Sequence, residues 1–242
     1  MRFSLLFTIA LLSVASLPHC MRVTDGIELD VAYQPAATPA AVRTDAGYRV
    51  RLERALIVVG RVDLLRCDNF VLDLWEFVAP ARARAHELST PTSLGVPLVI
   101  DLMESAGVPL FAGTLRPPPG SYCGVRVVGM PADQDAEGLT DQTLDMLHNS
   151  VLIEGQVEDE STGEETALAA SIWEILQYEM LFDQPLVFEG PVLESVSIQI
   201  DHGKWFDGID FALQDSSAVQ QQITENVRSS LQAVLPEAEA DL

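Results

Sequence analysis

In residues 194–201, Glu-Ser-Val-Ser-Ile-Gln-Ile-Asp, polar and apolar side chains alternate strictly from Ser195 onward. Successive side chains of a β-strand point to opposite faces of its sheet, so strict alternation is typical of a strand with one face in a core and the other in solvent. Here Val196, Ile198 and Ile200 form the apolar set. We therefore predict a half-buried strand at this position.

Similar strand signals recur along most of the chain, in short segments separated by Gly, Pro, Asn and Asp. Further strands are expected at residues 27–31, 48–53, 56–59, 62–65, 70–75, 97–103, 121–127, 151–157, 167–175 and 186–188. Many short strands with turn residues between them are typical of an all-β sandwich. We predict a sandwich domain at residues 47–213, preceded at 20–46 by a tether and a first strand.

The C-terminal segment follows a helical period instead. Asp215 and Ser216 offer a helix N-cap, and apolar residues then recur at every fourth position on one face. These residues are Val219, Ile223, Val227 and Leu231. The pattern predicts an amphipathic helix of about four turns within residues 214–235, packed on the sandwich, and an acidic tail at 236–242.

The N-terminus has the pattern of a secretory signal. Arg2 precedes an uncharged, largely apolar run at residues 3–17, which is shorter than the roughly 20 residues of a membrane-spanning helix. A leucine stands three residues before Cys20, as in the lipobox of bacterial lipoproteins, although cleavage after Ser16 would give a soluble periplasmic protein. We expect a signal peptide at residues 1–19, export to the periplasm or outer membrane, and membrane contact only through a lipid on Cys20.

The three cysteines support the same compartment. If Cys20 carries lipid, Cys67 and Cys123 remain as an even pair, which favours a disulfide outside the cytoplasm. Closing a loop of that length stabilises the fold by about 4 kcal/mol in the chain-entropy model. Because Cys123 shares a strand face with Val125 and Val127, we expect the disulfide on the core side, between the two sheets.

The charge balance limits the choice of partners. The chain has 14 Lys and Arg against 36 Asp and Glu, a formal net charge of −22. Such a protein repels nucleic-acid phosphates, so nucleic-acid binding is not expected. Basic proteins, cationic ligands and divalent metals are compatible with it.

Three histidines outside the leader are candidate copper or zinc ligands. His86 lies in a polar segment beside Glu87, His148 precedes the strand at 151–157, and His202 follows Asp201. Imidazole and carboxylate groups are suitable donors for both metals. No paired spacing of the histidines supports convergence, and scattered surface histidines are the alternative.

An acidic stretch offers a second metal candidate. Asp133, Asp135 and Glu137 resemble the opening of a calcium loop, with Asp141 as a further ligand. The twelfth position of the loop is Leu144, where an EF-hand needs a bidentate Glu. Weak calcium binding and a solvated acidic loop are the two interpretations.

No catalytic motif of a known class is present: there is no GxSxG, P-loop or GxGxxG after a strand. Asp207 and Asp210 are three residues apart, which would suit paired acid–base chemistry in a hydrolase. The simpler interpretation is a turn before the helix, with Trp205 and Phe206 as core anchors. We therefore expect a protein that is not an enzyme.

Residues 94–127 resemble a known group of proteins. Gly-Val-Pro-Leu-Val-Ile-Asp-Leu at 95–102 leads to Gly-Thr-Leu-Arg-Pro-Pro-Pro-Gly-Ser-Tyr at 113–122. This region resembles bacterial envelope lipoproteins of an uncharacterised domain family with a transthyretin- or immunoglobulin-like β-sandwich. The resemblance, which extends loosely over residues 50–211, implies a sandwich in the periplasm or at the cell surface. It supplies no activity.

Together these features favour a non-catalytic, exported envelope lipoprotein that binds a partner protein, a glycan or another envelope component. The alternative function is a periplasmic copper- or zinc-binding protein that uses His86, His148 and His202. A hydrolase that uses Asp207 and Asp210 is a third, weaker alternative.

Overall fold

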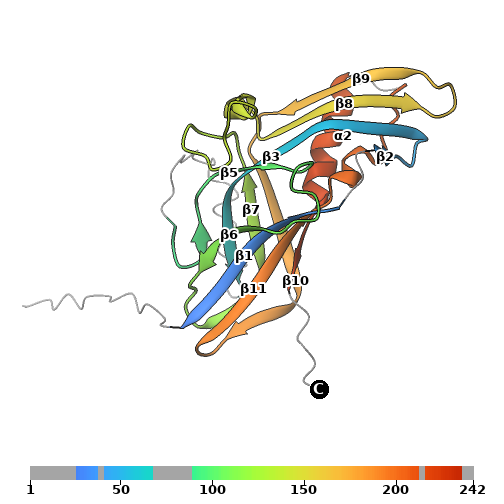
Figure 1. Ribbon diagram of the computed structural model, residues 1–242. Helices are drawn as coiled ribbons and strands as arrows, with labels where there is room; N and C mark the ends of the chain where they lie inside the picture. Colours follow the sequence, from blue (N-terminus) through green and yellow to red (C-terminus); the bar gives the residue numbers. More distant parts are fainter. Residues whose placement is uncertain (1–25, 38–40, 68–88, 213–215, 236–242) are drawn as a thin grey trace, which may run out of the picture.

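The computed structural model describes residues 26–37, 41–67, 89–212 and 216–235. These residues form two sheets that pack as a β-sandwich, with a helix near the C-terminus (Figure 1). The predicted all-β sandwich with a C-terminal helix is therefore confirmed. The expected signal peptide, the strand expected at 70–75 and the tail at 236–242 lie outside the described residues.

The first sheet has four strands in the order β12-β11-β1-β6. Their bounds are β1 Ile27–Pro35, β6 Leu110–Leu115, β11 Val192–Ile200 and β12 Leu231–Val234. β1 and β11 pair in parallel over their full length, although they lie near opposite ends of the chain. The predicted inward residues of β11, Val196, Ile198 and Ile200, are fully buried, which confirms the strand at 194–201.

The second sheet is built around β3, which spans the 19 residues Tyr48–Arg66. Its strand order is β10-β7-β3-β8-β9, and β2, β4 and β5 also pair with β3. The other bounds are β2 Ala41–Arg43, β4 Ser93–Leu94, β5 Leu98–Asp101, β7 Gly120–Gly129, β8 Val151–Asp159, β9 Glu165–Ile172 and β10 Leu176–Phe188. Ile57 pairs with both β5 and β8, and Val59 pairs with both β5 and β7. Because β5 occupies one edge of β3 at both residues, β8 and β7 follow one another along the opposite edge.

The middle of β3 explains why one strand looked like three in the sequence. The side chains of residues 55–59 are all buried, so polar and apolar residues do not alternate there. Ala55, Ile57 and Val59 face the core between the sheets. Leu56 and Val58 face a second apolar cluster, which the 3-10 helix η2 (Leu144–His148) and its neighbouring loop build on the outer face of the sheet.

The helix α2 (Ser216–Ser229) has the predicted length of about four turns but ends before Leu231. It buries Ile223 and Val227, as expected, but Leu231 belongs to β12, which pairs antiparallel with β11. Ser230 accounts for the end of the helix: its Oγ donates to the Val227 carbonyl at 2.8 Å and accepts from the Trp205 indole at 2.9 Å. A serine that bonds to the backbone competes with helix continuation in this way.

The 3-10 helix η3 (His202–Phe206) joins β11 to the segment before α2. Trp205 and Phe206 are fully buried in the main core, which confirms them as core anchors. Asn226 of α2 donates to the carbonyls of Trp205 and Asp207 at 3.0 and 2.8 Å. These bonds fix the helix against η3.

A disulfide joins Cys67 to Cys123, as predicted, but not between the two sheets. Cys67 directly follows β3, and Cys123 lies in β7, the neighbouring strand of the same sheet. The expected face was wrong because β7 bulges: Tyr122 and Gly124 pair with consecutive residues of β3, which leaves Cys123 as an extra residue. Tyr122 therefore takes the core position, while both cysteines are half-buried.

Candidate functional site

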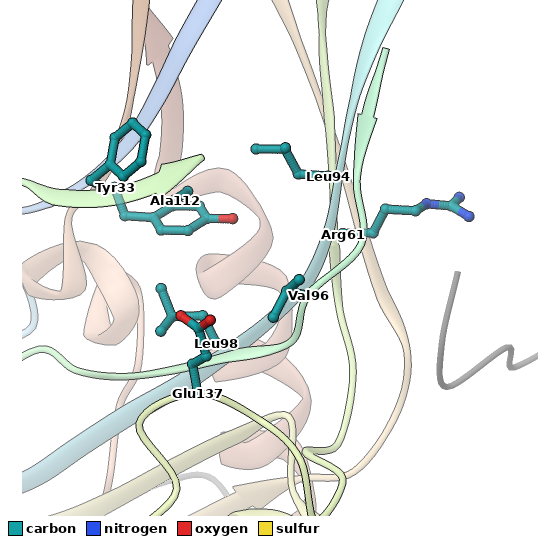
Figure 2. A pocket seen from close by; sticks show the side chains of 8 residues that line it. Tyr33, Arg61, Leu94, Val96, Leu98, Ala112 and Glu137 are labelled. Atoms are coloured by element: carbon teal, nitrogen blue, oxygen red, sulfur yellow. The ribbon is translucent and has the colours of Figure 1, made fainter. Parts of the chain in front are cut away.

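A small cleft with mixed polar and apolar walls opens at one edge of the sandwich, between β6 of the first sheet and the β4–β5 segment of the second. Figure 2 shows the side chains that line it. They are Tyr33, Arg61, Leu94, Val96, Leu98, Phe111, Ala112 and Glu137. In Figure 2 the Arg61 side chain points away from the other labelled side chains. Its Nε lies 2.9 Å from the Asp63 carboxylate. The cleft is therefore lined by aliphatic and aromatic groups with one acidic residue at its rim.

The wall on the side of the first sheet follows from the alternation of β1. Ile27, Leu29, Val31 and Tyr33 are its inward residues, and Tyr33 is the one whose side chain reaches the cleft. Tyr33 is 3% exposed. Burial raises the pKa of its hydroxyl far above the ordinary value, so this group is neutral and acts only as a hydrogen-bonding group.

The rim of the cleft leaves large apolar side chains in water. Phe111 on β6 is 66% exposed, and Val96, in the turn before β5, is 55% exposed. Among the described residues, β6 is the last strand of its sheet, and no further described strand lies beside Phe111. Apolar side chains grouped at a cleft are typical of an interaction surface rather than of an ordinary exposed residue.

The enclosed part of the cleft is small. Its volume is about 20 Å³, which is room for roughly one water molecule. A cofactor or a sugar ring needs several hundred Å³. A partner would therefore be held by contacts at the rim of the cleft rather than by a group inserted into it.

Glu137 is held at the cleft by its backbone. Its N–H donates to the Pro97 carbonyl at 2.9 Å, and its carbonyl accepts from the Val99 N–H at 2.8 Å, on either side of Leu98. Gly138 follows with a φ of +76°, and a side chain at that position would lie 2.5 Å from the Val99 carbonyl oxygen. This close approach requires glycine and fixes where the acidic loop crosses β5.

The acidic residues predicted as calcium ligands are not gathered around one point. The Asp133 carboxylate accepts from the N–H of Asp135 at 3.1 Å, within the loop, while Glu137 lines the cleft. In the described ranges, no three His, Cys, Asp or Glu side chains are placed to hold a metal ion. The loop instead covers the outer face of the second sheet with Ala132 and Ala136.

The candidate copper or zinc ligands lie in different environments. His148 is exposed at the end of η2, and His86 lies outside the described residues. His202, expected at the surface, is fully buried, because η3 turns it into the core beside Trp205, with the two ring centres 6.2 Å apart. Neither ring nitrogen of His202 has a hydrogen-bond partner, and burial lowers the pKa of the imidazole.

The aspartates considered for hydrolysis have separate environments in the turn after η3. The Asp210 carboxylate accepts from the Tyr48 hydroxyl at 2.7 Å and from the Ala212 N–H at 3.1 Å. Partial burial and the nearby Asp45 carboxylate raise the pKa of Asp207, which is exposed. The bonds to Asp210 tie the turn to β3, which is a structural role.

The cleft was not identified from the sequence. Its walls come from β1, β4, β5, β6 and the loop around Glu137, which only the strand pairing brings together. The available signal was Val96, an apolar residue between Gly95 and Pro97, where a turn normally carries polar side chains.

The disulfide indicates an oxidising, extracytoplasmic compartment. Among the residues with a described position, no helix is long and apolar enough to cross a membrane. Comparison of the chain with protein-family models, with curated proteins and with solved structures found no match. The resemblance at residues 94–127 implied a β-sandwich of a particular family. The structure supports the coarser statement that this is a mostly-β protein with two sheets.

Proposed function

We propose that this protein is an exported, lipid-anchored and non-catalytic module that binds another envelope protein through the cleft between β6 and the β4–β5 segment. The observation that carries the proposal is the exposed apolar rim formed by Val96 and Phe111. Removing large apolar side chains from water lowers the free energy, so a partner that covers Val96 and Phe111 would form a more stable complex.

The size and charge of the cleft favour a protein partner with a long basic side chain. An enclosed volume of about 20 Å³ is too small for a free sugar or cofactor. The methylene stem of a Lys or Arg would pack along Val96 and Phe111, and its charged end would meet Glu137. The net charge of −22 attracts such a partner from a distance.

Site-specific photo-crosslinking in the native host tests the interface. A photoreactive amino acid replaces Val96 at the cleft or, as the control, Leu193, which is equally apolar and 68% exposed on β11. We expect a light-dependent adduct with an envelope protein at position 96 only, and a several-fold weaker adduct when Glu137→Lys reverses the rim charge. The same adduct at both positions, no adduct at position 96, or no response to Glu137→Lys would refute the proposed interface.

The anchor is tested separately from the interface. Cells expressing the full chain are labelled with a palmitate analogue, alongside cells expressing Cys20→Ser. The expected result is a labelled wild-type protein in the membrane fraction and an unlabelled, soluble variant. An unlabelled wild-type protein would exclude the lipid anchor and leave the cleft result unaffected.

A further inference from the structure

The outer edge of β9 lacks the features that normally prevent two sheets from joining. β9 pairs with β8 over eight consecutive residues without a register shift, and of the strands in the described ranges it is the last in its sheet. Proteins usually protect such an edge with Lys, Pro, a bulge or a covering segment. β9 has the sequence Glu-Thr-Ala-Leu-Ala-Ala-Ser-Ile, with no Lys and no Pro.

The hydrogen-bond pattern identifies the free backbone groups. The Asp159 N–H donates to the Glu164 carbonyl at 2.9 Å, which sets the phase of the ladder between β8 and β9. In an antiparallel ladder alternate residues bond to the neighbouring strand, so Ala167 and Ala169 direct their N–H and C=O groups away from β8. The same phase directs the Ser171 carbonyl outward, where it accepts from Gln220 of α2 at 2.6 Å. The open part of the edge is therefore residues 165–169.

The charge on this edge is low for so acidic a protein. Glu165 forms an ion pair with Arg51 of β3, on the same outer face of the sheet. Ala167 and Ala169 are exposed and uncharged. Another strand can therefore approach the edge without meeting an unpaired carboxylate on residues 165–169.

We propose that β9 pairs with β9 of a second copy of this chain, antiparallel and about a two-fold axis at Leu168. This register places Ala167 opposite Ala169 of the second copy, so that the outward groups of both strands bond to each other. It also places Glu165 opposite Ser171 of the second copy, so no acid of β9 faces another acid. Because the Ser171 carbonyl already accepts from Gln220, the new ladder is formed by Ala167 and Ala169.

A large apolar side chain lies at the end of this edge: Trp173, directly after β9, is 67% exposed. The dimer is independent of the proposed cleft function, because no cleft residue belongs to β9.

Sedimentation velocity of the purified full chain, from 1 to 200 µM and at 0.05, 0.15 and 0.5 M NaCl, tests the dimer. We expect a reversible monomer–dimer equilibrium that tightens several-fold as salt screens the repulsion between two chains of net charge −22. Ala169→Pro should weaken dimerisation at least tenfold, because it removes an outward N–H but no hydrogen bond to β8.

Lysine variants provide the matched control and a second test should the proline variant fail to fold. Ala169→Lys should also weaken the dimer, whereas Gln156→Lys, on the exposed face of the neighbouring strand β8, should leave it unchanged or slightly tighter. A wild-type monomer at 200 µM and 0.5 M salt would overturn the proposal. Equal loss in both lysine variants, or no loss in Ala169→Lys, would also overturn it.

Discussion

Replacing His202 by leucine tests the energetics of the core around η3. His202 is fully buried, and both of its ring nitrogens lack a hydrogen-bond partner. A buried polar group without a partner costs about 1–3 kcal/mol of folding free energy. Leucine has a similar volume and no polar atoms, and such replacements cost less than about 1.5 kcal/mol in packing. We expect His202→Leu to raise the free energy of unfolding by about 1 kcal/mol at pH 8.

The effect should grow as the pH falls. Burial lowers the pKa of His202 in the folded protein below its ordinary value of about 6.5. Below that pH the unfolded chain binds a proton that the folded protein does not, so the wild type loses stability as pH decreases through 6.5 towards the folded pKa. A leucine has no such dependence. The difference in free energy of unfolding between variant and wild type should therefore widen between pH 7.5 and 5.5.

Urea denaturation at pH 5.5, 6.5, 7.5 and 8.5, with the disulfide intact, measures both effects. His148→Gln is the control, because His148 is exposed at the end of η2 and its replacement leaves the core around η3 intact. A His202→Leu variant that is less stable than wild type at every pH would refute the account of the unpaired ring nitrogens. A stability difference that does not change with pH would refute the assignment of the titration to His202.

Three other changes test separate parts of the fold. Replacing Cys67 and Cys123 together by serine removes a disulfide with a sequence separation of 56. The free energy of unfolding, measured by urea titration, should fall by about 4 kcal/mol. A loss below about 1 kcal/mol would contradict the loop-entropy explanation. Gly155→Ala places a Cβ 2.1 Å from the Arg51 carbonyl oxygen of β3 and should lower the free energy of unfolding by about 1–3 kcal/mol. Gly190→Ala, in open space, is the control and should be nearly neutral. Equal effects of the two variants would show that the close approach is unimportant. Tyr48→Phe removes the 2.7 Å hydrogen bond from the tyrosine hydroxyl to Asp210. The melting temperature should fall by several degrees, corresponding to a loss of about 1.5–3 kcal/mol in the free energy of unfolding. An unchanged melting temperature would show that this bond does not stabilise the turn.

The strands could be predicted wherever one face is buried and the other exposed. β11 alternates for this reason, whereas the middle of β3 does not, because its two faces contact different apolar clusters. The end of α2 was missed because Leu231 continues the helical period, and only the bonds of Ser230 to Val227 and Trp205 end the helix.

The disulfide and the cleft show a second limit of the sequence. The pairing of Cys67 with Cys123 followed from the number of cysteines, but its position depended on a bulge that shifts the faces of β7. The cleft depends on strand neighbours far apart in the chain, such as Tyr33 of β1 and Phe111 of β6. Local patterns contain no information about either arrangement.

The parallel pairing of β1 with β11 has a consequence for assembly of the chain. β1 precedes its parallel neighbour β11 by most of the described chain, and β12 follows β11. Without residues 192–200, β1 can pair only with β6 and leaves its other edge open. A folding intermediate that has not yet docked β11 therefore exposes unpaired backbone groups of β1 to other chains.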